Sequence, residues 1–245
     1  MAIATNFQVT ASRALPQSVV DTSVINARGS RYGDVVVENV WPTSHVQADE
    51  GSYFFANNAQ TGIATAAAPT SFSATNPFIA LLNNDTPNNP SAKRIYVDYV
   101  TLVNTAIGTG AASVQFAVSI DAATRYTSGG TTLTTSVYKA NGAGPASISA
   151  LYAGNLTVAA ATTANRPIIG QRYMKGAIPV AGDTYTVSFG SVDQTASLAV
   201  STIMFSLQGC GPVVLNPGEG FYMFLWFPSQ SGASSYAPEI GWCER

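Results

Sequence analysis

Short apolar runs separated by turn-forming residues recur from residue 78 to the C-terminus, and this rhythm constrains the fold more than any other feature of the chain. Turn signals rich in Gly, Pro and Asn, such as ANGAGP, LNPGEG and QSGA, stand between the runs. Several runs alternate as a half-buried strand requires. In RIYVDYVTLV, the alternation predicts Ile95, Val97, Tyr99 and Thr101 on one face and Tyr96, Asp98, Val100 and Leu102 on the other.

About ten strands are predicted in this part of the chain, and no segment has a persuasive amphipathic helical pattern. Closely spaced strands indicate a β-sandwich or a barrel, and long Gly-rich connections favour a jelly roll over an up-and-down barrel. We therefore expect an all-β protein: a jelly-roll-type β-sandwich over residues 76–245 with an extended N-terminal arm over residues 1–75. The strands are expected at residues 78–83, 94–104, 113–121, 132–138, 147–159, 166–174, 184–190, 201–208, 212–215, 220–228 and 239–244.

The first 75 residues differ in character from the rest. Strand-like pieces at residues 34–41 and 52–56 stand between polar and Ala-rich stretches, and residues 61–77 have the composition of a linker or an extended loop. Such an arm can pair with a neighbouring subunit by strand addition. YGDVVVENVWP is the expected contact segment, unless it forms a strand of the same domain. Its candidate contact residues are Tyr32, Val35, Val36, Val37 and Trp41.

FYMFLWF, at residues 221–227, is the longest apolar run and suits a strand. It follows LNPGEG, in which Pro217 presets φ and Gly218 tolerates the positive φ of a type II turn. The run predicts a central strand buried on both faces, either under a second layer of its own chain or against another subunit. Phe221, Met223, Leu225 and Phe227 belong to one face and Tyr222, Phe224 and Trp226 to the other. The candidate core or trimer-contact residues are Phe221, Tyr222, Phe224, Trp226 and Trp242.

The composition argues against several classes of partner. Only 10% of residues are charged and the formal net charge is −2, whereas proteins that bind nucleic acid through its phosphates usually carry a basic patch. No signal peptide and no apolar run of about 20 residues is evident, so we expect neither secretion nor a membrane span. Cys210 and Cys243 have no metal-binding spacing and are expected to be reduced core thiols rather than a disulfide.

The sequence contains no recognisable catalytic, cofactor-binding or metal-binding motif. His45 is the single histidine, and no nucleophile elbow accompanies it. Two weak possibilities involve carboxylates: Asp183 with Glu219 as a glycosidase pair, and Asp121 with Asp98 and Glu239 as a cation site. A third is a host-surface glycan bound by stacking on exposed aromatic residues. Its candidates are Trp41, Tyr53, Tyr126, Tyr138, Tyr152 and Tyr173.

Two segments resemble jelly-roll structural proteins of tailed bacteriophages. RIYVDYVTLVNTAIGTGAASVQFAVSIDAATRYTSGGTTLTTS, at residues 94–136, is similar to strand pairs in those proteins, and residues 213–245 are similar to their closing strands. The chain ends in an E-x-G-W-x-E-R pattern formed by Glu239, Gly241, Trp242, Glu244 and Arg245. The resemblance covers about half of the chain. It implies a virion component, often a trimeric capsid decoration (cement) protein.

The expected function is therefore a non-enzymatic decoration protein, made in the host cytoplasm, that binds the outer face of a phage head as a homotrimer. Its partners would be copies of itself and the major capsid protein. A low-charge, hydroxyl-rich surface suits such contacts because few charges need desolvation. The alternatives are a receptor- or glycan-binding tail or spike domain, and a jelly-roll major capsid protein.

Overall fold

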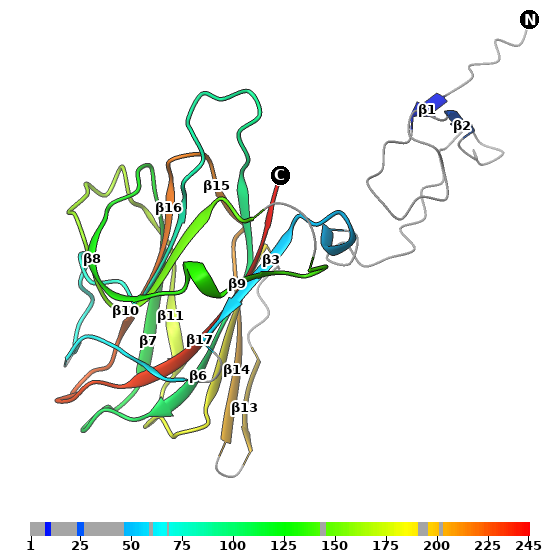
Figure 1. Cartoon of the computed structure of the whole chain (residues 1–245). Helices are drawn as coiled ribbons and strands as arrows, with labels where there is room; N and C mark the ends of the chain where they lie inside the picture. Colours follow the sequence, from blue (N-terminus) through cyan, green and yellow to red (C-terminus); the bar gives the residue numbers. More distant parts are fainter. Residues whose placement is uncertain are drawn as a thin grey trace, which may run out of the picture.

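The protein is described by a computed structural model that covers residues 8–10, 24–26, 47–58, 61–67, 69–142, 146–190, 196–200 and 203–245. Two large β-sheets stack face to face (Figure 1). The first sheet is six-stranded and antiparallel, in the order β11-β7-β16-β5-β10-β8. Its strands are β5 (Ile79–Asn83), β7 (Val114–Asp121), β8 (Tyr126–Thr132), β10 (Ser149–Val158), β11 (Ile168–Lys175) and β16 (Gly220–Trp226).

The second sheet has nine strands, with the path β13-β14-β12-β6-β17-β3-β9 and with β15 and β4 paired to β6 and β17. All its pairs are antiparallel except β12 with β14. Its strands are β3 (Tyr53–Asn57), β4 (Ile63–Ala64), β6 (Ile95–Ala106), β9 (Val137–Lys139), β12 (Thr184–Phe189), β13 (Ala196–Val200), β14 (Ile203–Cys210), β15 (Val213–Leu215) and β17 (Ser235–Glu244).

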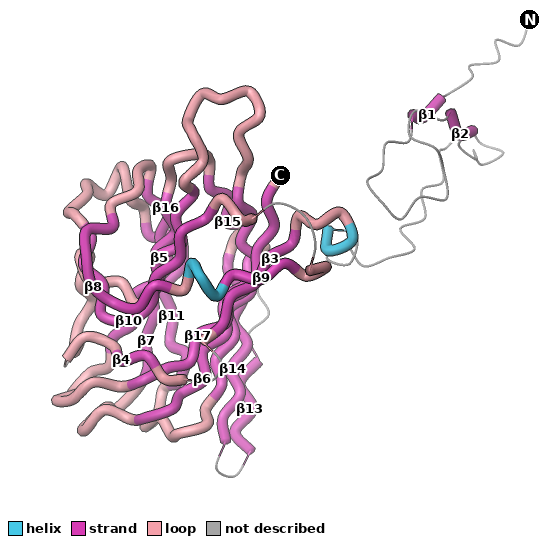
Figure 2. The backbone as a smooth tube through the Cα atoms, in the orientation of Figure 1, coloured by secondary structure: helices cyan, strands magenta, loops and turns pink. Residues whose placement is uncertain are grey.

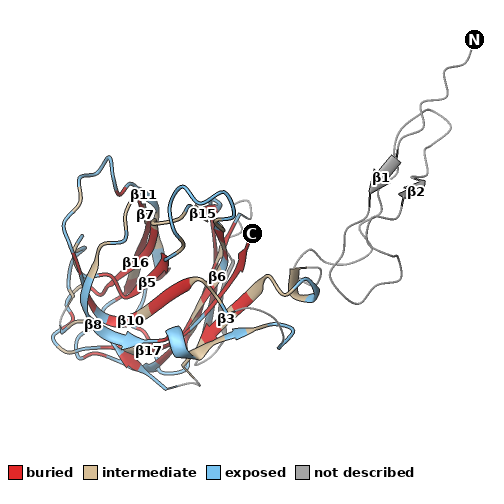
Figure 3. Ribbon diagram, turned by 45° about the horizontal axis from the view of Figure 1, so that its top comes forward, coloured by how far each residue is buried: buried red, intermediate tan, exposed pale blue. Residues whose placement is uncertain are grey.

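The chain crosses repeatedly from one sheet to the other, for example from β5 to β6, from β6 to β7 and from β15 to β16 (Figure 2). This alternation is the hallmark of a jelly roll, and the prediction of an all-β, jelly-roll-type sandwich is confirmed. Buried residues cluster where the two sheets face each other (Figure 3). The 3-10 turn η1 (Thr134–Ser136) leads from β8 into β9.

The sandwich includes residues that the sequence assigned to the arm. β3 pairs with β17 and β9, and β4 also pairs with β17. Phe54 and Ala56 of β3 are buried in the core, so the sheet extends to the N-terminal side of residue 75. Two further strands, β1 (Gln8–Thr10) and β2 (Val24–Asn26), pair with each other antiparallel. The expected contact residues Tyr32, Val35, Val36, Val37 and Trp41 lie outside the described residues.

β16 lies between β7 and β5, and all its residues are buried. Phe221, Met223 and Leu225 face the core between the sheets. Tyr222, Phe224 and Trp226 belong to a second cluster with residues of β5, β7 and β10. The loop after β4 covers part of this second cluster. Its Phe72 packs edge-on against Phe224 and Trp226, with ring centroids 5.1 and 5.7 Å away. The second layer therefore comes from the same chain.

All five residues expected in a core or trimer strand are buried. Trp242 of β17 is fully buried and stacks on Phe54, while Phe221, Tyr222, Phe224 and Trp226 are at most 5% exposed. Phe221 and Trp242 thus lie in the core between the sheets, whereas Tyr222, Phe224 and Trp226 are buried in the second cluster on the other face of β16. The turn before β16 has the expected form: Glu219 N donates to Asn216 O at 3.0 Å, and Gly218 has a φ of 83°.

Three local expectations were wrong. The stretch TSGGT at residues 127–131 has the composition of a turn, but it belongs to β8, where Gly129 and Gly130 adopt positive φ within an irregular strand pair. The strand expected at 132–138 is instead divided among the end of β8, η1 and β9. The alternation in β6 also changes phase: Val97 and Val100 both reach the core, because Asp98 is an extra residue between the pairs Tyr99–Gly241 and Val97–Trp242.

Candidate functional site

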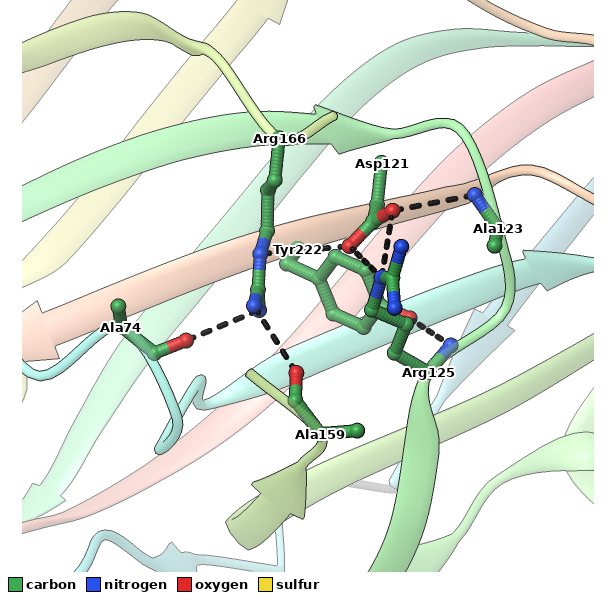
Figure 4. A network of polar contacts seen from close by, with 7 residues as sticks. All are labelled: Ala74, Asp121, Ala123, Arg125, Ala159, Arg166 and Tyr222. Carbon is green, nitrogen blue, oxygen red and sulfur yellow. Dashed lines mark hydrogen bonds and ion pairs between the residues drawn. The ribbon is translucent and has the colours of Figure 1, made fainter. Parts of the chain in front are cut away.

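Asp121 anchors a buried network of charges on the outer side of the six-stranded sheet (Figure 4). Its carboxylate accepts two hydrogen bonds from Arg125 Nε at 3.0 Å, and Arg166 Nε lies 3.3 Å away. Arg166 also donates to Ala74 O and Ala159 O, and its guanidinium lies 5.6 Å from the centre of the Tyr222 ring. Two cations neutralise one carboxylate, so this network binds loops together and leaves no free acid for catalysis.

The second buried ion pair joins Lys175 to Asp183, with 2.7 Å between Nζ and Oδ2. Tyr185 hydroxyl and Val180 N donate to the same oxygen, at 2.9 and 2.6 Å. The pKa of Tyr185 is raised, chiefly by burial and then by the nearby Tyr236 and Asp183. The pair joins the end of β11 to the residue just before β12 and so fixes the ends of the loop between these strands.

The expected glycosidase pair is not brought together. Asp183 O accepts a hydrogen bond from Asn104 N, near the end of β6. Glu219 O accepts one from Asn83 N, while Asn83 Nδ2 donates to Lys93 O just before β6 begins. The two acids thus lie near opposite ends of β6, a strand of 12 residues and about 35 Å at 3.3 Å per residue. This separation far exceeds the roughly 5–10 Å that glycosidases use.

The proposed cation site is not assembled either. Asp121 lies in the six-stranded sheet, whereas Asp98 and Glu239 lie in the nine-stranded one. Tyr53 hydroxyl donates to Asp98 at 2.8 Å and Tyr99 hydroxyl donates to Glu239 at 2.6 Å. Among the described residues, no group of three or more His, Cys, Asp or Glu side chains is arranged to hold a metal ion. Cys210 and Cys243 are buried thiols that are not joined in a disulfide, as expected.

Several exposed apolar side chains belong to β11 and to the loop that follows it. We call this set, which consists of Ile168, Ile169, Tyr173, Ile178 and Val180, the apolar strip. Its members are 36–67% exposed, with Ile178 the most exposed at 67%. Among the strands that the structure describes, β11 pairs with β7 alone and is the end strand of its sheet. A register shift between Ile168 and Gly170 makes Ile169 an extra residue, so two consecutive isoleucines are exposed.

The apolar strip is firmly supported. Ile178 and Val180 lie on the loop that the Lys175–Asp183 pair and the Val180 N–Asp183 hydrogen bond close. Gly182 N also donates to Asn104 O, which ties the loop to β6. A pre-ordered apolar surface loses little conformational entropy on binding, so this arrangement suits a protein–protein contact.

A hollow of about 440 Å³ lies on the nine-stranded sheet, between β6, β15 and the start of β3. Tyr53, Tyr96 and Asp98 supply its aromatic and acidic groups. The pKa of Tyr53 is raised, first by burial and then by its hydrogen bond to Asp98. We call this set of side chains and its cavity the tyrosine hollow. The lining residues are Gln47, Tyr53, Tyr96, Val97, Asp98, Phe189, Pro212, Val213, Val214 and Cys243.

The aromatic residues expected to bind glycans lie in different places. Tyr126 and Tyr152 stack on each other, with ring centroids 3.9 Å apart, and so cover each other's faces. Tyr138 packs against Phe55, and Tyr173 belongs to the apolar strip. Only Tyr53 lines the tyrosine hollow, while Trp41 and His45 lie outside the described residues.

The sequence did not single out the apolar strip, or Tyr96 as a binding residue. The signal for the strip was present in RPIIGQRYM, where two adjacent isoleucines precede a glycine and break strict alternation. For the hollow no local signal exists, because its lining comes from segments that are more than 140 residues apart in the chain, such as Tyr96 and Cys243.

Comparison with known proteins yields no relative: no family model, no curated protein and no solved structure matches this chain. Within the described part of the chain, no helix has the length and apolar character needed to cross a membrane.

Proposed function

We propose that this protein is a non-enzymatic structural component of a virion, namely a capsid decoration protein that assembles as a homotrimer on the outer face of a phage head. The observation that carries the assembly part is the apolar strip. Five partly exposed apolar side chains on a sheet edge and its adjoining loop form a surface that is costly to leave in water.

The position of the strip suits contact between copies. An end strand offers unpaired backbone groups for pairing, and natural edges are usually protected by charge, proline or short length. β11 has eight residues, and two isoleucines and a tyrosine are among its exposed side chains. In a closed ring of subunits, the strip of one copy would pack on its neighbour and leave no edge open.

The virion part has a different support, which is the resemblance of residues 94–136 and 213–245 to jelly-roll structural proteins of tailed phages. These residues include the neighbouring strands β6 and β17 of one sheet and β7 and β16 of the other, together with β8 and β15. With only 10% charged residues, the surface suits repeated close contacts with a shell of the major capsid protein.

The first test is the native mass of the full chain by light scattering across a dilution series. We expect a particle of three chains, each of 25.5 kDa, that persists into the nanomolar range. Tyr173→Asp, which places a charge in the apolar strip, should shift the equilibrium to monomers. Tyr138→Asp is the matched control, because Tyr138 is 52% exposed against 59% for Tyr173 and lies on the other sheet.

A wild-type chain that stays monomeric at micromolar concentration would overturn the trimer. A Tyr173→Asp variant that remains a trimer would show that the apolar strip is not part of the subunit interface.

The second test is co-sedimentation with shells made from the major capsid protein of the same virus. We expect saturable binding with a fixed ratio of decoration protein to shell protein. If the chain instead closes into shells without a partner, it is the major capsid protein. If it neither binds shells nor forms them, the virion proposal fails.

A further inference from the structure

We infer that the tyrosine hollow is a binding site for a neutral saccharide of one or two rings, an activity that the proposed structural role does not require. Its volume of about 440 Å³ lies within the range of roughly 300–1,000 Å³ that is usual for small-ligand sites. The hollow also has the usual composition of such sites, because apolar walls surround a few polar groups.

Asp98 lies in the hollow at an irregularity of β6. Tyr99 pairs with Gly241 and Val97 pairs with Trp242, so Asp98 is the extra residue of a β-bulge. Bulges re-aim side chains and are common beside functional sites. Here Tyr96 and Asp98 line the same cavity, as residues two apart on a strand do, while the bulge lets both Val97 and Val100 remain in the core.

The Asp98 carboxylate is held in place yet keeps capacity to accept hydrogen bonds. Tyr53 hydroxyl donates to Oδ2 at 2.8 Å, and no Lys or Arg among the described residues forms an ion pair with Asp98. A carboxylate has about four lone-pair sites, so those not used by Tyr53 can accept bonds from neighbouring hydroxyls of a sugar. Gln47 adds an amide that can both donate and accept.

The aromatic and aliphatic walls complement the faces of a sugar ring, which consist of C–H groups, whereas its hydroxyl groups lie at the edges. Tyr53 and Tyr96 are half-buried, so part of each side chain remains accessible. Pro212 and Val214 supply aliphatic surface from β15 and the turn before it. A ligand with polar edges and apolar faces satisfies both kinds of wall at once.

Gly241 leaves room for two tyrosines, of which Tyr53 lines the hollow. A Cβ at this residue would lie 2.7 Å from Tyr53 Oη and 2.3 Å from Tyr99 Cε1. Tyr53 therefore lies directly against the β17 backbone, so this wall of the hollow is pre-ordered before a ligand arrives.

The charge of the hollow selects against other ligand classes. Asp98 is the one charged residue among the ten that line it, so an anionic ligand would meet repulsion and no cation. A cationic side chain would find a single exposed carboxylate, and exposed ion pairs contribute little in water. A neutral polyol uses both the carboxylate and the apolar walls.

The test is ligand-observed NMR with the full chain, using methyl glycosides of glucose, galactose, mannose and N-acetylglucosamine together with maltose, cellobiose and lactose. At least one saccharide is expected to bind saturably. Asp98→Ala and Tyr96→Ala should each weaken its binding at least tenfold. Glu239→Ala is the matched control, because Glu239 is also an exposed carboxylate that accepts from a tyrosine but does not line the hollow.

Three outcomes would overturn the inference. The first is that no saccharide of the panel binds saturably. The second is that Glu239→Ala weakens binding as much as Asp98→Ala. The third is that arginine methyl ester, included as a cationic probe, binds at the hollow while the saccharides do not. None of these outcomes bears on the native mass, so the inference and the proposed function can fail independently.

Discussion

Single residues decide how this weakly charged chain keeps charge in its interior. Arg166 is 7% exposed and contacts Asp121, two backbone carbonyls and the Tyr222 ring. It thereby joins the loop before β5 and the segment just after β10 to the C-terminal end of β7. A buried charge is costly unless it is paired, so removing one partner has a larger effect than the pair's own contribution to stability.

Replacing Arg166 by Met should therefore lower the free energy of unfolding by about 3–5 kcal/mol, because Asp121 loses one of its two cations inside the protein. Urea unfolding followed by tryptophan fluorescence measures the change. Arg245→Met is the matched control: the Arg245–Glu50 pair is about half exposed on both sides and should cost less than about 1 kcal/mol. Equal effects of the two substitutions would contradict a structural role for the Asp121 network.

Among the elements, the turn that leads from β15 in one sheet to β16 in the other shows how one turn positions a central strand. Asn216 N and Nδ2 donate to the Glu219 carboxylate, and Gly218 N donates to Asn83 O. The turn thus starts β16 in register with β5, where Gly220 pairs with Leu82. That register places Phe221 in the main core and Tyr222 in the outer cluster.

Gly218→Ala should destabilise the protein by about 1–3 kcal/mol, because φ at this position is 83° and the added Cβ would lie 3.2 Å from Pro87 Cγ. Gly211→Ala is the control, since nothing lies within 4 Å of a Cβ there; its effect should be within about 0.5 kcal/mol. Both values come from the same urea unfolding assay. A neutral Gly218→Ala would mean that the turn does not need a left-handed residue.

For the whole molecule, β17 is the strand on which the nine-stranded sheet depends. It pairs with β6 along almost its full length and with β3 and β4 on its other side. Its side chains include the fully buried Tyr236, Ile240 and Trp242. β3, in turn, places Phe54 in the same core. The two ends of the sandwich sequence therefore meet in the middle of one sheet.

Deletion of residues 236–245 should abolish folding, because β6 would lose its longest partner and the core would lose Trp242. Deletion of residues 1–46 should leave a chain that unfolds cooperatively, since the sandwich strands from β3 onward remain complete. Circular dichroism and thermal unfolding of the two soluble fractions give the comparison. A deletion of residues 1–60, in contrast, would remove β3. A native-like chain without residues 236–245 would refute the central role of β17.

The sequence by itself determined what depends on near neighbours along the chain. Alternation in FYMFLWF assigned its residues to two buried faces, and Pro217 with Gly218 indicated the type II turn, because both features arise from local backbone geometry. Short apolar runs between turns were enough for the all-β sandwich.

Only the tertiary structure decided the features that need distant partners. The bulge at Asp98 is defined by the pairing of β6 with β17, and the irregularity of β8 by its pairing with β10. Neither could be predicted from the sequence of its own segment. Phe72 became the cover of Phe224 and Trp226 because its loop folds back over β16. The tyrosine hollow and the exposure of the apolar strip follow from sheet order and register, which long-range packing sets.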